Sequence, residues 1–177
     1  MIEKIVSSGR QSAERAALDV AVRWQFPCGG WCSLGSAIAQ EMPPMFHLSE
    51  TPSPRRCQAL EWNIRDSDAT VLFTISREPL PENEQAMEFV RLHRKPFLHI
   101  PAHGVFDINL TVEKLQRFLE ENAVRILHVT GSSATHEPDV WRWTFVLLET
   151  ALFWDKAHPN TLCDPLRVMS SSNNSLR

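Results

Sequence analysis

The sequence has no long hydrophobic run, no excess of basic residues and few cysteines, and each of these absences excludes a class of protein. No segment approaches the ~18 consecutive apolar residues of a membrane span, so no membrane partner is expected. The formal net charge of −3 lacks the basic excess that binding to a nucleic-acid backbone requires, so no nucleic-acid partner is expected. Four cysteines without framework spacing are typical of reduced thiols rather than of a disulfide scaffold.

The composition favours one globular domain. The chain has 177 residues, of which 43% are hydrophobic and 22% are charged, which is enough for one compact core and too few for two. We expect a single Rossmann-like domain over residues 1–160. A disordered tail is expected over residues 164–177, which contain the run Ser-Ser-Ser-Asn-Asn-Ser. The first residues show no signal-peptide pattern, so a cytoplasmic location is expected.

Short runs of β-branched and aromatic residues alternate with stretches of helical periodicity. The runs predict strands at residues 5–6, 26–31, 69–75, 96–100 and 125–129. The periodic stretches predict helices at residues 13–25, 54–65, 84–93, 111–122 and 138–153. This alternation predicts an α/β fold, a Rossmann-like doubly wound parallel sheet of about five or more strands with helices on both faces.

Local signals also predict how some of these segments begin. Residues 35–51 have no clear period and contain Pro43 and Pro44, so we expect a long surface loop there. Thr111 is the expected N-cap of the fourth helix, and Pro138 is expected in the first turn of the last helix.

The opening stretch IVSSGRQSAERAALDVA, residues 5–21, has the form of a strand, a tight loop and a helix. Free N–H groups and the helix dipole make such a helix N-terminus a favourable place for an anion. In a parallel sheet the loops at the carboxyl ends of the strands meet at one edge, and here these are residues 7–12, 77–85 and 130–136. The first loop contains a single glycine, Gly9, which leaves open whether it still holds an anionic ligand.

Three groups of motifs, in this order, resemble those of a known family. They are IVSSGRQSAERAALDVA, then PCGGWCSLG followed by LSETPS, then EWNIRDSDATVLF followed by KPFLHI. Over residues 1–153 the chain is similar to the molybdenum-cofactor carrier family, a branch of the SLOG, or lysine-decarboxylase-like, Rossmannoid superfamily. The resemblance implies a doubly wound α/β fold that binds a nucleotide-like or pterin-phosphate ligand at the carboxyl ends of the strands. It also implies the molybdenum cofactor or a nucleotide as the molecule that is bound.

The candidate ligand-binding residues lie in the loops and motifs that carry this resemblance. They are Ser8, Gly9, Arg10, Gln11, Ser12, Gly30, Trp31, Asp66, Ser67, Asp68, Gly131, Ser132 and Ser133. For the segment RDSDA there is an alternative that the turn chemistry of Asp and Ser favours: it ends a helix and turns into a strand, with Asp66 and Asp68 as caps and turn formers.

The first loop departs from the family pattern. The family's Gly-Gly-Gln-Thr-Gly-Ala-Asp corresponds to residues 8–14, so Ser8 and Ser12 replace two of three glycines. Each replacement is expected to strain the backbone by ~1 kcal/mol if the family geometry is kept. Arg10, by contrast, could add a cationic contact to a phosphate. This loop therefore leaves both outcomes open.

The second loop departs further. The family's Thr-Gly-Gly-Ser corresponds to residues 81–84, which brings in Glu82 and Glu84. Two carboxylates at the positive end of a helix would repel a phosphate placed there. Basic residues that are usual in the family are also replaced, by Leu34, Ser36 and Ser133. We therefore expect weak or absent binding of phosphate ligands.

The sequence does not support catalysis or a metal site. Cys28 and Cys32 lack a second pair of ligands, and His99 and His103 lack a third ligand nearby. There is no Gly-x-Ser-x-Gly elbow for acyl transfer, and the PGGxGT signature of the superfamily's N-glycosidic hydrolases is missing. The function expected is therefore that of a non-enzymatic binding protein. The alternative is a degenerate member that has lost its ligand and acts as an interaction or structural module.

The last predicted helix is apolar over much of its circumference. Its large apolar side chains are Trp141, Trp143, Phe145, Val146, Leu147, Leu148, Leu152, Phe153 and Trp154. Core packing accounts for part of this surface, and a contact between subunits through residues 138–154 accounts for the remainder.

A homodimer or higher oligomer is therefore expected, because a second copy would cover the apolar surface that the core leaves exposed. Sedimentation velocity at micromolar concentration measures this directly. A single species at the monomer mass of 20.2 kDa would reject the prediction.

Overall fold

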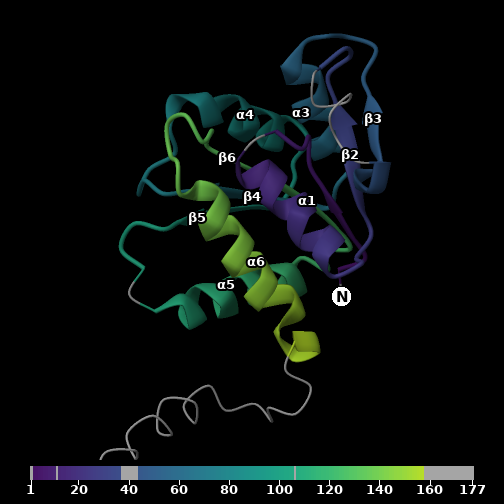
Figure 1. Ribbon diagram of the computed structural model, residues 1–177. Coiled ribbons are helices and arrows are strands. Elements are labelled where there is room, and N and C mark those ends of the chain that lie inside the picture. Colours follow the sequence, from purple (N-terminus) through teal and green to yellow (C-terminus); the bar gives the residue numbers. More distant parts are fainter. Residues whose placement is uncertain (1, 11, 37–43, 106, 158–177) are drawn as a thin grey trace, which may run out of the picture.

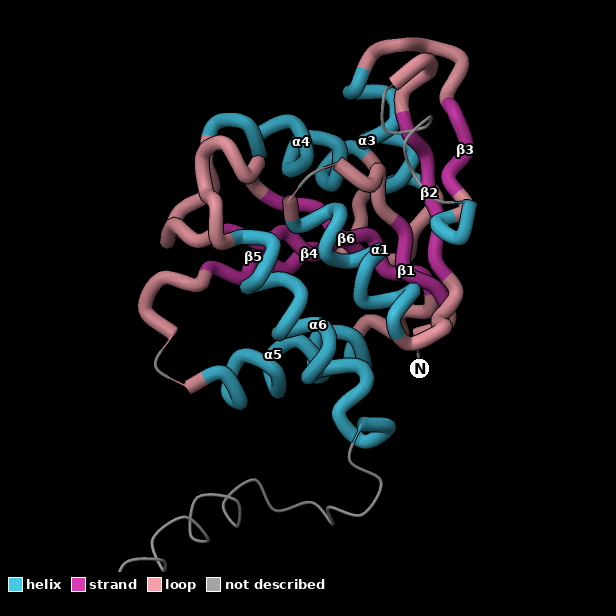
Figure 2. Tube along the Cα trace, in the orientation of Figure 1, coloured by secondary structure: helices cyan, strands magenta, loops and turns pink. Residues whose placement is uncertain are grey.

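The structure is a computed structural model that describes residues 2–10, 12–36, 44–105 and 107–157 (Figures 1 and 2). In this part of the chain six strands form one sheet, in the order β3-β2-β1-β6-β4-β5, and the pairings of neighbouring strands are parallel. The predicted α/β fold with a Rossmann-like parallel sheet is confirmed.

The elements follow one another as the alternation predicted, with one extra strand. The strands are β1 (Lys4–Val6), β2 (Cys28–Cys32), β3 (Leu48–Glu50), β4 (Ala69–Thr74), β5 (Phe97–Pro101) and β6 (Ile126–Gly131). The helices are α1 (Ala13–Arg23), α3 (Arg56–Arg65), α4 (Glu84–Leu92), α5 (Ile108–Glu121) and α6 (Val140–Ala157), with short 3-10 turns η1 (Pro44–Phe46) and η2 (Pro81–Asn83).

The path of the chain through the sheet places the helices on both faces. From β1 the chain steps outward to β2 and β3, crosses to β4 and β5, and returns to β6 between β1 and β4. Right-handed crossovers then put α1 and α5 on one face and α3 and α4 on the other. Figure 1 shows α6 beside α1 and α5, and α3 beside α4 across the sheet, in agreement with the helix pairs that are in contact.

The two faces of the sheet carry different side chains. The face under α1, α5 and α6 is apolar, and its buried residues form one core with these helices. Strand residues of this core are Ile5, Val71, Phe73, Ile100, Leu127 and Val129. Because side chains alternate along a strand, their neighbours Thr70 and His128 point to the face under α3 and α4. There Thr70 Oγ1 lies 3.2 Å from His128 Nδ1, and both residues are buried.

The predicted loop at residues 35–51 was wrong in its last part. Residues 48–50 form β3, which pairs with β2 at the edge of the sheet, and residues 44–46 form η1. A strand of three residues is too short to show a period, and β2 needs a partner for its outer N–H and C=O groups. Pro43 lies outside the described residues.

Two predicted helix starts also require correction. Thr111 is not the N-cap of α5, since the helix begins at Ile108 and Asp107 is its cap, accepting from Asn109 N at 2.8 Å. Asp107, four residues before Thr111, provides the cap instead, because its carboxylate reaches a free N–H group of the first turn. Pro138 lies in the turn before α6, where Val140 N donates to Glu137 O at 3.1 Å. The tail predicted over residues 164–177 lies outside the described residues.

Most of the apolar surface of helix α6 packs against other parts of the chain. It packs against α1 and α5, and Trp143, Phe145 and Leu152 contact the core. Exposure is 38% for Trp141 and 39% for Val146. The homo-oligomer stays a prediction.

In the described part of the chain no helix meets the length and hydropathy that a membrane crossing requires.

Acidification is expected to destabilise the fold through His128, because burial lowers the pKa of this imidazole from 6.5 to about 3. Between these values the unfolded chain binds a proton that the folded protein does not, so the free energy of unfolding decreases as the pH falls. The slope from this residue is up to about 1.4 kcal/mol per pH unit. His128→Asn should reduce the pH dependence of stability in urea unfolding between about pH 6 and about pH 4.

His103→Asn is the matched control, because His103 is exposed and its replacement removes an imidazole without opening the core. A pH dependence that is the same in the wild type and in His128→Asn would contradict the assignment to His128.

Candidate functional site

Strands β6 and β4 are neighbours, but the chain leaves them toward opposite faces of the sheet, to α6 after β6 and to α4 after β4. Ligands of open parallel sheets bind outside the carboxyl ends of the strands at such a point. The three loops predicted to meet at this edge do so. A β-bridge links Ser12 to Ser133, and Asn83 Nδ2 donates to Ser132 Oγ at 3.0 Å.

The loops surround a crevice that is made of two adjoining cavities. The larger has a volume of about 420 Å³ and lies between the first loop, the segment after β2 and the start of α3. The smaller has a volume of about 230 Å³ and extends to Thr130 and Gly131 at the end of β6. Arg10, Glu14, Arg56 and Glu82 line both cavities, so two positive and two negative side chains meet in this switch-point crevice.

The two arginines are available for a ligand. Arg10 lies in the first loop and Arg56 is the first residue of α3. The ion pairs among the described residues include neither of them, although Glu14 and Glu82 line the same cavities. Guanidinium groups recognise phosphate oxygens through paired N–H donors, so two of them in one crevice favour an anion.

Glu14 is a buried acid at the base of the crevice, in the first turn of α1, with an exposure of 6%. Ser8 Oγ donates to its Oε2, and Thr130 Oγ1 donates to its Oε1 at 3.1 Å. The sequence prediction included Ser8 but missed Glu14. The available signal was its position, since Glu14 stands where the family's loop motif ends in Asp.

The carboxylate of Glu82 is engaged by groups of the β6–α6 loop. Ser133 N donates to Glu82 Oε1 at 2.7 Å, and His136 Nδ1 lies 3.2 Å from Oε2. The carboxylate thereby takes a backbone N–H at the start of the β6–α6 loop that could otherwise bind an anion. Glu84 is exposed and lines neither cavity, so the repulsion expected from both glutamates comes from Glu82.

The strain expected in the first loop is absent. Gly9 has a φ of 73°, a left-handed conformation that favours glycine. Ser12 has a φ of 160°, which is extended backbone, and Ser8 is not among the non-glycine residues with positive φ. Both serines therefore fit this loop without the penalty that the family pattern predicted.

Gly131 is required by close packing. A Cβ at this position would lie 2.3 Å from Phe73 O and 2.6 Å from Ala13 Cβ. Only glycine lets β6, β4 and the start of α1 approach each other as they do. Gly131 thus shapes the smaller cavity, which it lines together with Ser133.

The predicted residues Asp66, Ser67 and Asp68 do not reach the crevice, because they connect α3 to the amino end of β4. Asp66 is the C-cap residue of α3, and Ser67 Oγ donates to Ile64 O. Asp68 Oδ2 accepts from the backbone N–H groups of residues 125 and 126, at 2.9 and 2.7 Å. The geometry supports the alternative, in which they are turn formers.

Gly30 and Trp31 are also separate from the crevice. They lie within β2 and line another cavity on the face of the sheet under α3. A Cβ at Gly30, where φ is 140°, would lie 2.3 Å from Ser7 O, so glycine is needed there for backbone packing. Gln11 lies outside the described residues.

Glu137 is a structural residue that the sequence prediction missed. It is 5% exposed, and its carboxylate accepts from Ile75 N at 2.8 Å and Ser76 N at 2.7 Å. Burial by itself raises the pKa of this carboxyl, but the hydrogen bonds from Ser76 and Ile75 outweigh it, and the pKa lies below its usual value. Glu137 thereby ties the loop after β4 to the loop after β6.

Within the described part of the chain, the cysteines and histidines form no evident reactive centre. Cys28 and Cys32 are buried, and burial raises the pKa of both thiols, which disfavours the reactive thiolate. In residues 2–10, 12–36, 44–105 and 107–157 no group of three or more His, Cys, Asp or Glu side chains is placed to hold a metal ion.

Comparison with known proteins agrees with this architecture. Residues 5–152 match the model of a family described as the circularly permutated YpsA SLOG family. The 1.45 Å crystal structure of a protein described as "putative molybdenum carrier protein", from Syntrophus aciditrophicus SB, is similar with a TM-score of 0.79 and 29% sequence identity. That match covers 85% of this chain and 95% of the other. Comparison with curated proteins gave no match.

Glu137→Gln is expected to lower the free energy of unfolding by about 1–3 kcal/mol, because the amide leaves one of the two part-buried N–H groups without an acceptor. Urea unfolding at neutral pH measures the change. Glu88→Gln, at an exposed position of α4, is the control and should be within about 0.5 kcal/mol of the wild type. Equal stability of the two variants would contradict the role of Glu137.

Proposed function

Since the chain belongs to the circularly permutated YpsA SLOG family, we propose that it binds a small phosphate-bearing ligand in the switch-point crevice. The ligand class is a nucleotide or a pterin phosphate. The relative from Syntrophus aciditrophicus is described as a molybdenum carrier, which supports the molybdenum cofactor as one member of this class. The observation that carries the proposal is the pair Arg10 and Arg56, which line one cavity of about 420 Å³.

In this proposal the two ends of the ligand meet opposite charges. The phosphate lies between the guanidinium groups of Arg10 and Arg56, close to the N-terminus of α1. Glu14 and Glu82 line the same crevice as acceptors, and they suit the hydroxyl groups of a ribose or the amino and ring N–H groups of a pterin. A ligand with both an anionic end and a donor-rich end fits this crevice better than phosphate alone.

The proposed role is binding without catalysis. Around Ser133 the geometry argues against an activated hydroxyl, because Ser133 Oγ and Glu82 Oε2 both contact the same ring nitrogen, His136 Nδ1, at 2.9 and 3.2 Å. A base that passes a proton from a nucleophile needs its orienting acid on the other nitrogen. This arrangement therefore supports a binding protein rather than an acyl-transfer enzyme.

The second candidate is a degenerate member that acts as an interaction or structural module. One observation favours it: Glu82 already accepts the N–H of Ser133, which a phosphate would otherwise use. In that case the crevice is closed to anions by the chain itself, and the arginines serve only solubility.

Binding of AMP should increase when the Glu82 charge is removed. We expect weak binding to the wild type and about fivefold tighter binding to Glu82→Gln, since even a screened repulsion amounts to ~1 kcal/mol. Arg10→Ala and Arg56→Ala should each weaken binding by about tenfold, because each removes a charge-assisted contact. Isothermal titration calorimetry measures all four proteins.

Glu84→Gln is the matched control, because Glu84 is close to Glu82 in sequence but does not line the crevice. The affinity of this variant for AMP should equal that of the wild type. A thermal-shift panel of nucleotides and molybdopterin identifies the preferred member of the class. No stabilisation of the wild type or of Glu82→Gln by any of them would favour the second candidate. Tight binding that neither Glu82→Gln nor the arginine variants change would place the ligand outside this crevice.

A further inference from the structure

A separate cavity of about 260 Å³ lies on the face of the sheet under the C-terminal end of α3. It shares no lining residue with the switch-point crevice. Arg56, the first residue of α3, lines the crevice, whereas Asp66, just after its last residue, lines this cavity. The two cavities therefore lie at opposite ends of one helix, and we call the second the α3 C-terminal cavity.

The α3 C-terminal cavity contains a cation, Lys4, that has no hydrogen-bond or ion-pair partner among the described residues. Lys4 of β1 lines it and is half-buried, and the hydrogen bonds and ion pairs of the described residues include none from its ammonium group. Gly29 leaves the space that Lys4 occupies, since a Cβ there would lie 3.4 Å from Lys4 Nζ and 2.9 Å from His47 O. A half-buried ammonium without an acceptor favours a bound anion.

The acid in the same cavity does not compensate Lys4. Asp66 is already engaged, since Arg65 donates to both of its carboxylate oxygens, at 2.7 and 3.0 Å, and Trp31 Nε1 donates to Oδ2 at 2.8 Å. The hydrogen bond from Arg65 also holds the pKa of Asp66 below its usual value. The unbalanced charge of the cavity is therefore the positive charge of Lys4.

The remaining walls include the polar residues His47, Ser49 and Asn63 and an apolar part that is fixed in position. Trp31 is held by its hydrogen bond to Asp66 and by edge-to-face packing on Trp62, with ring centroids 4.8 Å apart. Asn63 further fixes the backbone of Trp31, accepting from its N–H at 2.8 Å and donating to its C=O at 2.9 Å. Val6 and Ile126 line the cavity from the sheet. A flat apolar group fits against the part of the wall that Trp31, Val6 and Ile126 form.

We propose that the α3 C-terminal cavity binds a small organic carboxylate with a planar apolar body. The carboxylate accepts from the Lys4 ammonium, and the body packs against the Trp31 indole, Val6 and Ile126. A volume of about 260 Å³ limits the body to about one ring, which is at the small end of ligand pockets. This site is independent of the phosphate-bearing ligand proposed for the switch-point crevice.

Benzoate and its neutral isostere benzamide test the proposal on the wild-type protein. Benzoate should bind at least about tenfold more tightly than benzamide in calorimetry, because only the carboxylate forms a charge-assisted hydrogen bond with Lys4. Equal affinity for the two compounds would overturn the proposal. Binding by inorganic phosphate that displaces benzoate would also overturn it, since it would mean that the cavity selects charge alone.

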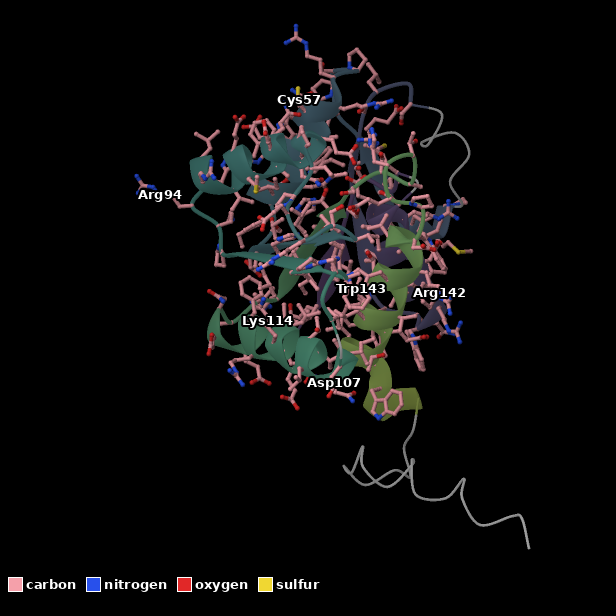
Figure 3. All side chains as sticks on the ribbon, turned by 90° about the vertical axis from the view of Figure 1, so that its left-hand side faces the viewer. Cys57, Arg94, Asp107, Lys114, Arg142 and Trp143 are labelled. Carbon is pink, nitrogen blue, oxygen red and sulfur yellow. The ribbon has the colours of Figure 1, made fainter. Side chains whose placement is uncertain are left out.

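Variants of Lys4 complete the test. Lys4→Met keeps the length of the side chain and should weaken benzoate binding about tenfold, whereas Lys4→Arg keeps the charge and should retain most of it. Lys114→Met, at an exposed position of α5 (Figure 3), is the control and should bind as the wild type does. Unchanged binding by Lys4→Met would overturn the proposal. Arg10→Ala should leave benzoate binding intact, which separates this site from the crevice.

Discussion

Parallel strands leave backbone N–H groups without a strand partner where each strand ends, and in this protein the chain's own carboxylates accept many of these groups. Glu137 accepts from two N–H groups after β4, and Glu82 accepts from one after β6. At the opposite edge Asp68 accepts from the N–H groups of residues 125 and 126. Each of these bonds joins segments that are far apart in the sequence, so together they help to determine how the loops lie relative to one another.

The same carboxylates shape what the crevice can bind. In a loop of small, neutral residues the free N–H groups themselves would attract an anion. Here Glu82 accepts one of these N–H groups, and Glu14 accepts hydrogen bonds from two side-chain hydroxyl groups. Attraction for an anion therefore depends on the side chains of Arg10 and Arg56. Under the proposed function, a ligand that brings hydrogen-bond donors as well as a phosphate would match this mixture of charges.

The position of β6 explains why the site is assembled from distant parts of the sequence. Strand β6 is the last in the chain but lies at the centre of the sheet, between β1 and β4 (Figure 2). If β6 and α6 preceded β1, the strands would follow outward from the centre on both sides, as the family's circular permutation implies. The loop at residues 130–136 therefore meets the first loop in space although more than a hundred residues separate them in the chain.

The sequence by itself determined the alternation of strands and helices, because buried parallel strands are apolar runs and the helices that cover them are periodic. It also predicted which loops meet, since parallel strands share one carboxyl edge. It did not predict β3, whose three residues are too few to show a period. Only the tertiary structure decided that Glu82 and not Glu84 faces the crevice, and that Trp31 and Asp66 belong to another cavity. Both depend on strand register and on the direction of α3, which arise from packing between segments distant in the chain.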